Sequence, residues 1–199
     1  MGHQINIGMR PVYKFLDVDN HQEISDEVYE YIVDHTDAIL NKDYFNDQSI
    51  HHMLSHCPLL VEFLNSRYLV PERLATIVCS NTDKIHMHKD NDGADPYIRI
   101  LWPVRNCQGS KTKIWRVPDG AGSLTSDSDG ILFVDFPPNQ ECELIDEFEL
   151  SSPLVFDASC AHSVHPNTDL TGHRISFTIG FDKNLPISKS IKAWFGFQR

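Results

Sequence analysis

Residues 159–181 read SCAHSVHPNTDLTGHRISFTIGF, and this stretch gives the strongest indication of the fold. It opens with His162 in a His-x-Val-x-Pro context, followed by a polar turn over residues 167–172. The turn leads into an alternating strand with two faces, on which Arg174, Ser176 and Thr178 oppose Ile175, Phe177 and Ile179. Such a hairpin can bring a histidine ligand of a metal close to a pair of side chains that binds a carboxylate.

The composition is that of an ordinary globular domain with an acidic balance. Of the 199 residues, 41% are hydrophobic and 23% are charged, and the formal net charge is −11. Nucleic-acid binding requires a basic stripe, and no apolar run approaches the roughly 18 residues of a membrane span. We expect a single domain over residues 1–199 without a nucleic-acid or membrane partner; the oligomeric state is left open.

The five cysteines bear on the cellular compartment. They are scattered, odd in number and include no Cys-x-x-Cys pair. This usage is typical of buried thiols in a reducing environment rather than of a disulfide framework. A cytoplasmic location is therefore the expectation.

Two patterns divide the chain. Helical spacing of apolar residues dominates about residues 20–67, with helices expected at about 23–40, at about 48–56 and after Pro58. From about residue 73 to 182 the pattern changes to about eight short strands separated by turn clusters. The fold class is therefore mainly β with N-terminal helices (α+β), with the helices packed on one sheet of a sandwich or barrel.

His88 and Asp90 form a His-x-Asp pair where a strand runs into a turn. Residues two apart on a strand share a face, so this pair can hold one metal ion. A second His-x-Asp, His35-Thr36-Asp37, lies in the first expected helix. Residues two apart on a helix point about 200° away from each other, so that pair cannot chelate.

A third ligand is expected from a distant strand of the same sandwich. His162 fits this position, and two histidines with one carboxylate leave open positions on iron(II) for oxygen and a bidentate cosubstrate. His165 can replace His162 in this reading, and His86 is either a ligand or a supporting donor. His52 and His56 are one helical turn apart, but no glutamate follows His52, as a zinc-protease helix requires.

Arg174 and Ser176 are candidates for binding a carboxylate. An arginine that faces the interior of a sandwich is costly unless a carboxylate meets it. Its planar fork suits a bidentate carboxylate, and Ser176 on the same face can donate to that carboxylate. Because the opposite face of this strand is apolar, Arg174 either faces solvent or lines a cavity, and His162 twelve residues upstream favours the cavity. Trp102 either lines the same pocket or belongs to the core.

Taken together, these residues resemble the motifs of the iron(II)- and 2-oxoglutarate-dependent oxygenases. The match comprises His88-Lys89-Asp90, His162 and Arg174-Ile175-Ser176, with the closest local likeness to prolyl-hydroxylase-type members. The resemblance implies a double-stranded β-helix (jelly-roll, cupin-like) core at about 73–182, supported by helices at about 20–67. It also implies iron(II) bound by His88, Asp90 and His162, and 2-oxoglutarate held by Arg174 and Ser176.

The implied activity is hydroxylation of an unidentified substrate, with consumption of O₂ and release of succinate and CO₂. The substrate is a small molecule, an amino acid or a peptidyl residue such as proline. One alternative is a cupin-like metal-binding sandwich without oxygenase activity, an isomerase or a binding module, for which Arg174 is dispensable. Another is a structural or interaction protein, whose stability would not respond to iron and 2-oxoglutarate.

Overall fold

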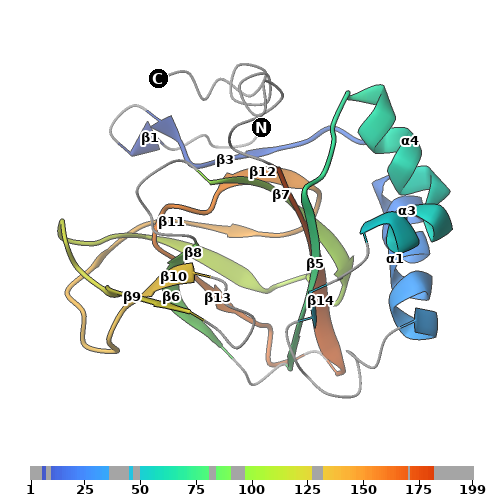
Figure 1. Ribbon diagram of the computed structural model, residues 1–199. Helices are drawn as coiled ribbons and strands as arrows, with labels where there is room; N and C mark the ends of the chain where they lie inside the picture. Colours follow the sequence, from blue (N-terminus) through green and yellow to red (C-terminus); the bar gives the residue numbers. More distant parts are fainter. Residues whose placement is uncertain are drawn as a thin grey trace.

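The computed structural model describes residues 6–7, 10–35, 45–46, 50–80, 84–90, 97–126, 132–169 and 171–181. Within these ranges two antiparallel sheets face each other, and three helices cover one of them (Figure 1). The helices are α1 (His21–His35), α3 (Ile50–His56) and α4 (Pro58–Ser66). None of them is long and apolar enough to cross a membrane.

The helix-backed sheet has the order β3-β12-β7-β14-β5-β4. Its strands are β3 (Tyr13–Phe15), β12 (Leu154–Asp157), β7 (Ile98–Arg105), β14 (His173–Gly180), β5 (Arg73–Ser80) and β4 (Phe45–Asn46). The other sheet, called the site sheet below, has the order β11-β8-β13-β6-β10-β9. Its strands are β11 (Glu143–Glu149), β8 (Lys111–Arg116), β13 (His162–His165), β6 (Ile85–Asp90), β10 (Leu132–Asp135) and β9 (Ser123–Ser126). A separate two-stranded pair joins β1 (Asn6–Ile7) to β2 (Arg10–Pro11).

The chain crosses repeatedly between the two large sheets. Strands β5, β7, β12 and β14 belong to the helix-backed sheet, whereas β6, β8, β11 and β13 belong to the site sheet. This alternation winds the chain into a double-stranded β-helix, so the predicted fold class, with helices packed on one sheet, is confirmed. Side chains on the inner faces of both sheets consequently meet in one interior.

The helical layer covers the apolar face of β14. Ile175, Phe177 and Ile179 are almost completely buried there, in one cluster with residues of all three helices. Trp102 of β7 is fully buried in the same cluster, and its indole N–H donates to Ser25 Oγ of α1 at 3.0 Å. Trp102 therefore belongs to the core beneath α1 and does not line a pocket between the sheets.

Helix α1 also contacts the N-terminus of α4 through hydrogen bonds. Helix α4 begins with Pro58 after Cys57, which makes no side-chain cap. Instead, the Glu27 carboxylate of α1 accepts hydrogen bonds from the backbone N–H groups of Leu59 and Leu60, both at 3.0 Å. A negative charge at this end complements the helix dipole and satisfies two donors that otherwise lack a partner within the helix.

Residues 162–165, which include His162 and His165, form the strand β13. Within the polar stretch 119–130, residues 123–126 form the strand β9, which pairs with β10, and residues 127–130 lie outside the described ranges. Helix α1 ends at His35, and the rest of the expected helix, residues 36–40, is likewise not described.

Candidate functional site

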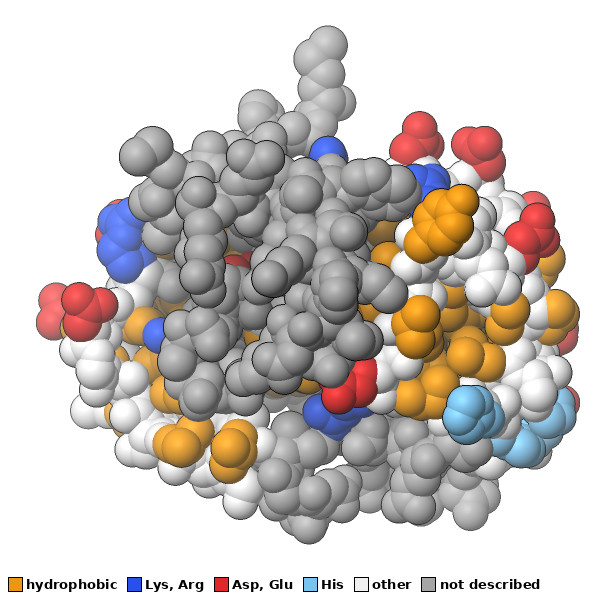
Figure 2. All heavy atoms as spheres, turned by 45° about the horizontal axis from the view of Figure 1, so that its top comes forward, with side chains coloured by type: hydrophobic (Ala, Val, Ile, Leu, Met, Phe, Trp, Pro, Cys, Tyr) orange, Lys and Arg blue, Asp and Glu red, His pale blue; other side chains and the backbone are white. Residues whose placement is uncertain are grey.

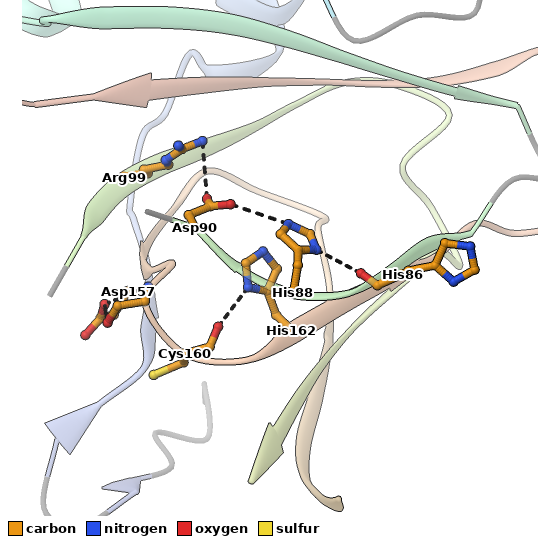
Figure 3. Close-up of polar contacts among 8 residues, drawn as sticks. His86, His88, Asp90, Arg99, Asp157, Cys160 and His162 are labelled. Carbon is orange, nitrogen blue, oxygen red and sulfur yellow. Dashed lines mark hydrogen bonds and ion pairs between the residues drawn. The ribbon is translucent and has the colours of Figure 1, made fainter. Parts of the chain in front are cut away.

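Two neighbouring strands of the site sheet bring the predicted metal ligands together. Strand β6 places His88 and Asp90 on one face, and the pairing of β13 with β6 sets His162 directly opposite His88. One ligand atom from each of these three residues lies within 4.8 Å of the other two. Figure 3 shows the three side chains converging from the two strands.

Backbone carbonyls orient both imidazole rings. The Nδ1–H group of His88 donates to the carbonyl of His86 at 2.8 Å, and that of His162 donates to the carbonyl of Cys160 at 2.9 Å. A carbonyl only accepts, so each Nδ1 carries a proton, and Nε2 is the atom that binds a metal when the ring is neutral. Supporting contacts of this kind fix the tautomer of metal-binding histidines.

A buried carboxylate shapes the turn that delivers His162. Asp157 Oδ1 accepts from the backbone N–H of Tyr97 at 3.2 Å and from the Ser159 hydroxyl at 2.6 Å. In the same turn the carbonyl of Ala158 accepts from the N–H of Asp90 at 2.8 Å. The turn is therefore tied both to the start of β7 and to the end of β6, which holds the two ligand-bearing strands in place.

Arg99 is a member of the site that the sequence analysis missed. Its Nη1 lies 3.3 Å from Asp90 Oδ2, whereas Asp90 Oδ1 faces His88 Nε2 at 3.4 Å. The arginine is buried and its guanidinium stacks over the Tyr97 ring. Arg99 thus engages one oxygen of Asp90 and leaves the other directed towards the histidines (Figure 3).

These neighbours set the charge state of the ligands. Burial alone would raise the pKa of Asp90, but the positive charge of Arg99 and the hydrogen bond from His88 hold that pKa well below its usual range. Burial, reinforced by the charge of His88, lowers the pKa of His162 to about 4. At neutral pH Asp90 is a carboxylate and His162 a neutral imidazole, which are the forms that bind a metal.

Burial also opposes protonation of His88, but the hydrogen bond and the charge of Asp90 outweigh it and raise the pKa of His88. A bound metal cation would replace the proton of His88 as the positive partner of Asp90. The donor set, two imidazoles and one carboxylate with ligand atoms already close, fits iron(II).

Arg174 and Ser176 lie on the face of β14 turned towards the site sheet, since the alternate residues face the helices. Both are buried, and Arg174 Nη1 donates to Ser176 Oγ at 3.0 Å. Arg174 Nε and the hydroxyl of Thr178, on the same face, have no hydrogen-bond partner, and no ion pair among the described residues includes Arg174. A buried guanidinium with no carboxylate partner in the described part of the chain can bind an anion.

The alternative histidines lie elsewhere. The ring of His86 points away from the three ligands and only its carbonyl takes part (Figure 3). His165 Nε2 lies 3.1 Å from the Ser163 hydroxyl, which accepts from the indole N–H of Trp115 at 2.8 Å. Of the two histidines of the His-x-Val-x-Pro stretch, the structure brings His162 to His88 and Asp90.

Comparisons with known proteins identify the fold. No protein-family model matches the chain, and no curated protein matches it in sequence. Among solved structures, the apo form of the non-heme monooxygenase ThoJ matches with a TM-score of 0.51 at 12% identity, over 85% of this chain and 73% of ThoJ. In its fold the chain therefore resembles this non-heme oxygenase, in agreement with the resemblance of its motifs.

Two further structures match over most of the chain. AviO1 from Streptomyces viridochromogenes Tue57 has a TM-score of 0.48 at 13% identity, covering 89% of this chain and 92% of AviO1. A prolyl-4-hydroxylase from Pseudomonas putida has a TM-score of 0.42 at 13% identity, covering 87% of each chain. At these identities the function has to be argued from the site itself.

Proposed function

We propose that the chain is an iron(II)- and 2-oxoglutarate-dependent oxygenase that hydroxylates a small molecule, an amino acid or a peptidyl residue. In this proposal His88, Asp90 and His162 hold the iron, and Arg174 with Ser176 binds the far carboxylate of 2-oxoglutarate. When bound, the iron and cosubstrate supply the activation of O₂, with release of succinate and CO₂.

The observation that carries the proposal is the buried Arg174, which has no acidic partner among the described residues and lies in the same interior as the His88–Asp90–His162 group. A metal-binding sandwich without a carboxylate ligand has no need of a buried guanidinium, because burying that charge costs free energy. A cosubstrate with a carboxylate at each end needs a cation remote from the metal. The two features together favour the oxygenase over a cupin-like protein.

The residues have separate tasks in this mechanism. Arg174 and Ser176 orient the cosubstrate by binding its far end, so that its other end reaches the metal in one pose. Arg99 holds Asp90 in its ionised form and fixes the direction of the carboxylate. Phe156 packs edge-on against the His162 ring, with ring centroids 4.8 Å apart, and helps to keep water from that side of the site.

Anaerobic titration of the apoprotein with Fe(II) and then 2-oxoglutarate tests the proposal. The visible charge-transfer band of an iron–2-oxoglutarate chelate is expected in the wild type and should require far more cosubstrate in Arg174→Ala. Arg116→Ala is the matched control, since Arg116 is an exposed arginine of β8 paired with Glu143. Iron binding without a band at any 2-oxoglutarate concentration would favour the cupin-like alternative.

Once the band is established, substrates can be sought by stimulation of succinate release. Amino acids, prolyl peptides and small hydroxylatable molecules form the first panel, because the sequence resemblance suggests this range. A compound that raises succinate release, and whose mass spectrum shows the gain of one oxygen atom, identifies the substrate class.

A further inference from the structure

Three exposed histidines meet on the helical layer, apart from the site between the sheets. His35 is the last residue of α1, and His52 and His56 lie one turn apart on α3. One ligand atom from each lies within 4.8 Å of the other two. Figure 2 shows histidine side chains gathered on the surface on the side that carries the helices.

The rings are held in a common arrangement. The His35 and His56 ring centroids are 4.6 Å apart, those of His52 and His56 are 4.5 Å apart, and those of His35 and His52 are 5.2 Å apart. A metal cation binds the neutral form of an imidazole, so three rings this close together can share one ion.

The Nδ1 atom of every ring is already occupied. His35 Nδ1 donates to the carbonyl of Tyr31 at 3.1 Å, and His56 Nδ1 donates to the carbonyl of His52 at 2.8 Å. His52 Nδ1 lies 3.0 Å from the hydroxyl of Tyr31, which can accept its proton. His35 and His56 therefore present Nε2 as the ligand atom, and His52 does so in the tautomer whose Nδ1 donates to Tyr31.

Tyr31 contacts the histidine group from the buried side of the helical layer. It is buried, and its ring stacks on His35 with centroids 4.8 Å apart and planes inclined by 18°. Its hydroxyl and its carbonyl contact two different members of the cluster. A single buried residue thus positions ligands from two helices, which is how a supporting contact orients a metal site.

We propose that His35, His52 and His56 form a second metal site, which takes a zinc-class divalent ion and joins the end of α1 to α3. A tetrahedral zinc with bonds of about 2.0 Å separates its ligand nitrogens by about 3.3 Å, so small side-chain rotations close the group around the ion. The fourth position takes water. The ligand set has no carboxylate, which favours zinc over the harder ions that prefer oxygen ligands.

The test removes the site between the sheets and asks whether zinc still binds. In full-length apoprotein carrying His88→Ala and Asp90→Ala, we expect one equivalent of zinc by competition with a chromophoric chelator. Adding His56→Gln or His35→Gln should weaken that binding at least about 100-fold, and Tyr31→Phe about 10-fold. Zinc should also raise the melting temperature in this background and fail to do so with His56→Gln.

His51→Gln is the matched control, since His51 is an exposed histidine of α3 outside the cluster. It should leave zinc affinity unchanged within about twofold, which is smaller than the effect of losing even a supporting contact. Absence of stoichiometric zinc binding in the double-alanine background would overturn the proposal. Equal loss in His51→Gln and His56→Gln, or binding that survives all three cluster substitutions, would overturn it as well. Because the background lacks two residues of the oxygenase site, the outcome is independent of the proposed oxygenase function.

Discussion

The two histidine groups among the described residues differ in burial, in ligand composition and in the side chain that supports them. His88, Asp90 and His162 lie between two sheets, include a carboxylate, and have a buried arginine beside them. His35, His52 and His56 lie exposed on helices, contain no carboxylate, and rest on a buried tyrosine. Ligand chemistry and surroundings together decide which metal a histidine cluster can hold, and on that basis we propose iron for the first group and a structural ion for the second.

The largest expected effect comes from His162→Ala. Removing one of three ligands should weaken iron binding between the sheets at least about 100-fold, because even supporting residues are worth about 10- to 100-fold. Zinc binding at the helical cluster should not change. Equilibrium dialysis with each metal measures both affinities.

His165→Ala is the control for this prediction, since His165 contacts Ser163 rather than the other two ligands. If His165→Ala and not His162→Ala abolished iron binding, the assignment of the third ligand would be wrong.

Next in size is Arg174→Met, which should separate stability from cosubstrate binding. Loss of a buried, hydrogen-bonded charge pair costs about 2–5 kcal/mol of binding free energy, so 2-oxoglutarate affinity should fall about 30-fold or more. The melting temperature of the apoprotein should stay the same or rise, because an apolar side chain replaces a buried charge that has no acidic partner within the described ranges. Thermal unfolding with and without iron and 2-oxoglutarate measures both quantities.

A large loss of apoprotein stability in Arg174→Met would contradict this account. It would mean that the guanidinium has a structural partner rather than a ligand.

A smaller effect is expected for Arg99→Gln. Without the arginine, Asp90 keeps its contact with His88 but loses the partner of its second oxygen, so metal affinity between the sheets should fall about 10-fold. Isothermal titration with Mn(II), which favours a site containing a carboxylate, measures the change. Arg99→Lys should restore part of the affinity, whereas a purely steric role would leave the two variants alike.

The smallest effect on the affinity for either metal is expected for Ser25→Ala. The substitution leaves the buried indole N–H of Trp102 without its acceptor, which costs about 1–3 kcal/mol of unfolding free energy. Urea denaturation measures this loss. Iron affinity should be unchanged, because α1 contacts the outer face of the helix-backed sheet and the proposed iron site lies on the other side. A parallel loss of iron affinity would show that the two layers are coupled.

The residue patterns predicted the fold class and much of the site. Alternation in the strand of residues 174–181 identified its apolar face, which packs against the helices, and so implied the inward direction of Arg174. The same argument applied to Ile98, Arg99 and Ile100 would have found Arg99, a charged residue on the inner face of an equally apolar strand. Trp102 was ambiguous because its own alternation does not reveal which face of β7 carries the helices.

The sequence alone specifies the placement of residues that are close in the chain: a strand of period two puts His88 and Asp90 on one face, and a helix puts His52 and His56 one turn apart. The distant residue that completes each group is selected by the tertiary structure. The register of β13 against β6 selects His162, and the packing of α1 against α3 through Tyr31 brings in His35. Register and helix packing are set by burial of the whole core, to which residues far apart in the chain contribute, so neighbouring residues alone do not specify them.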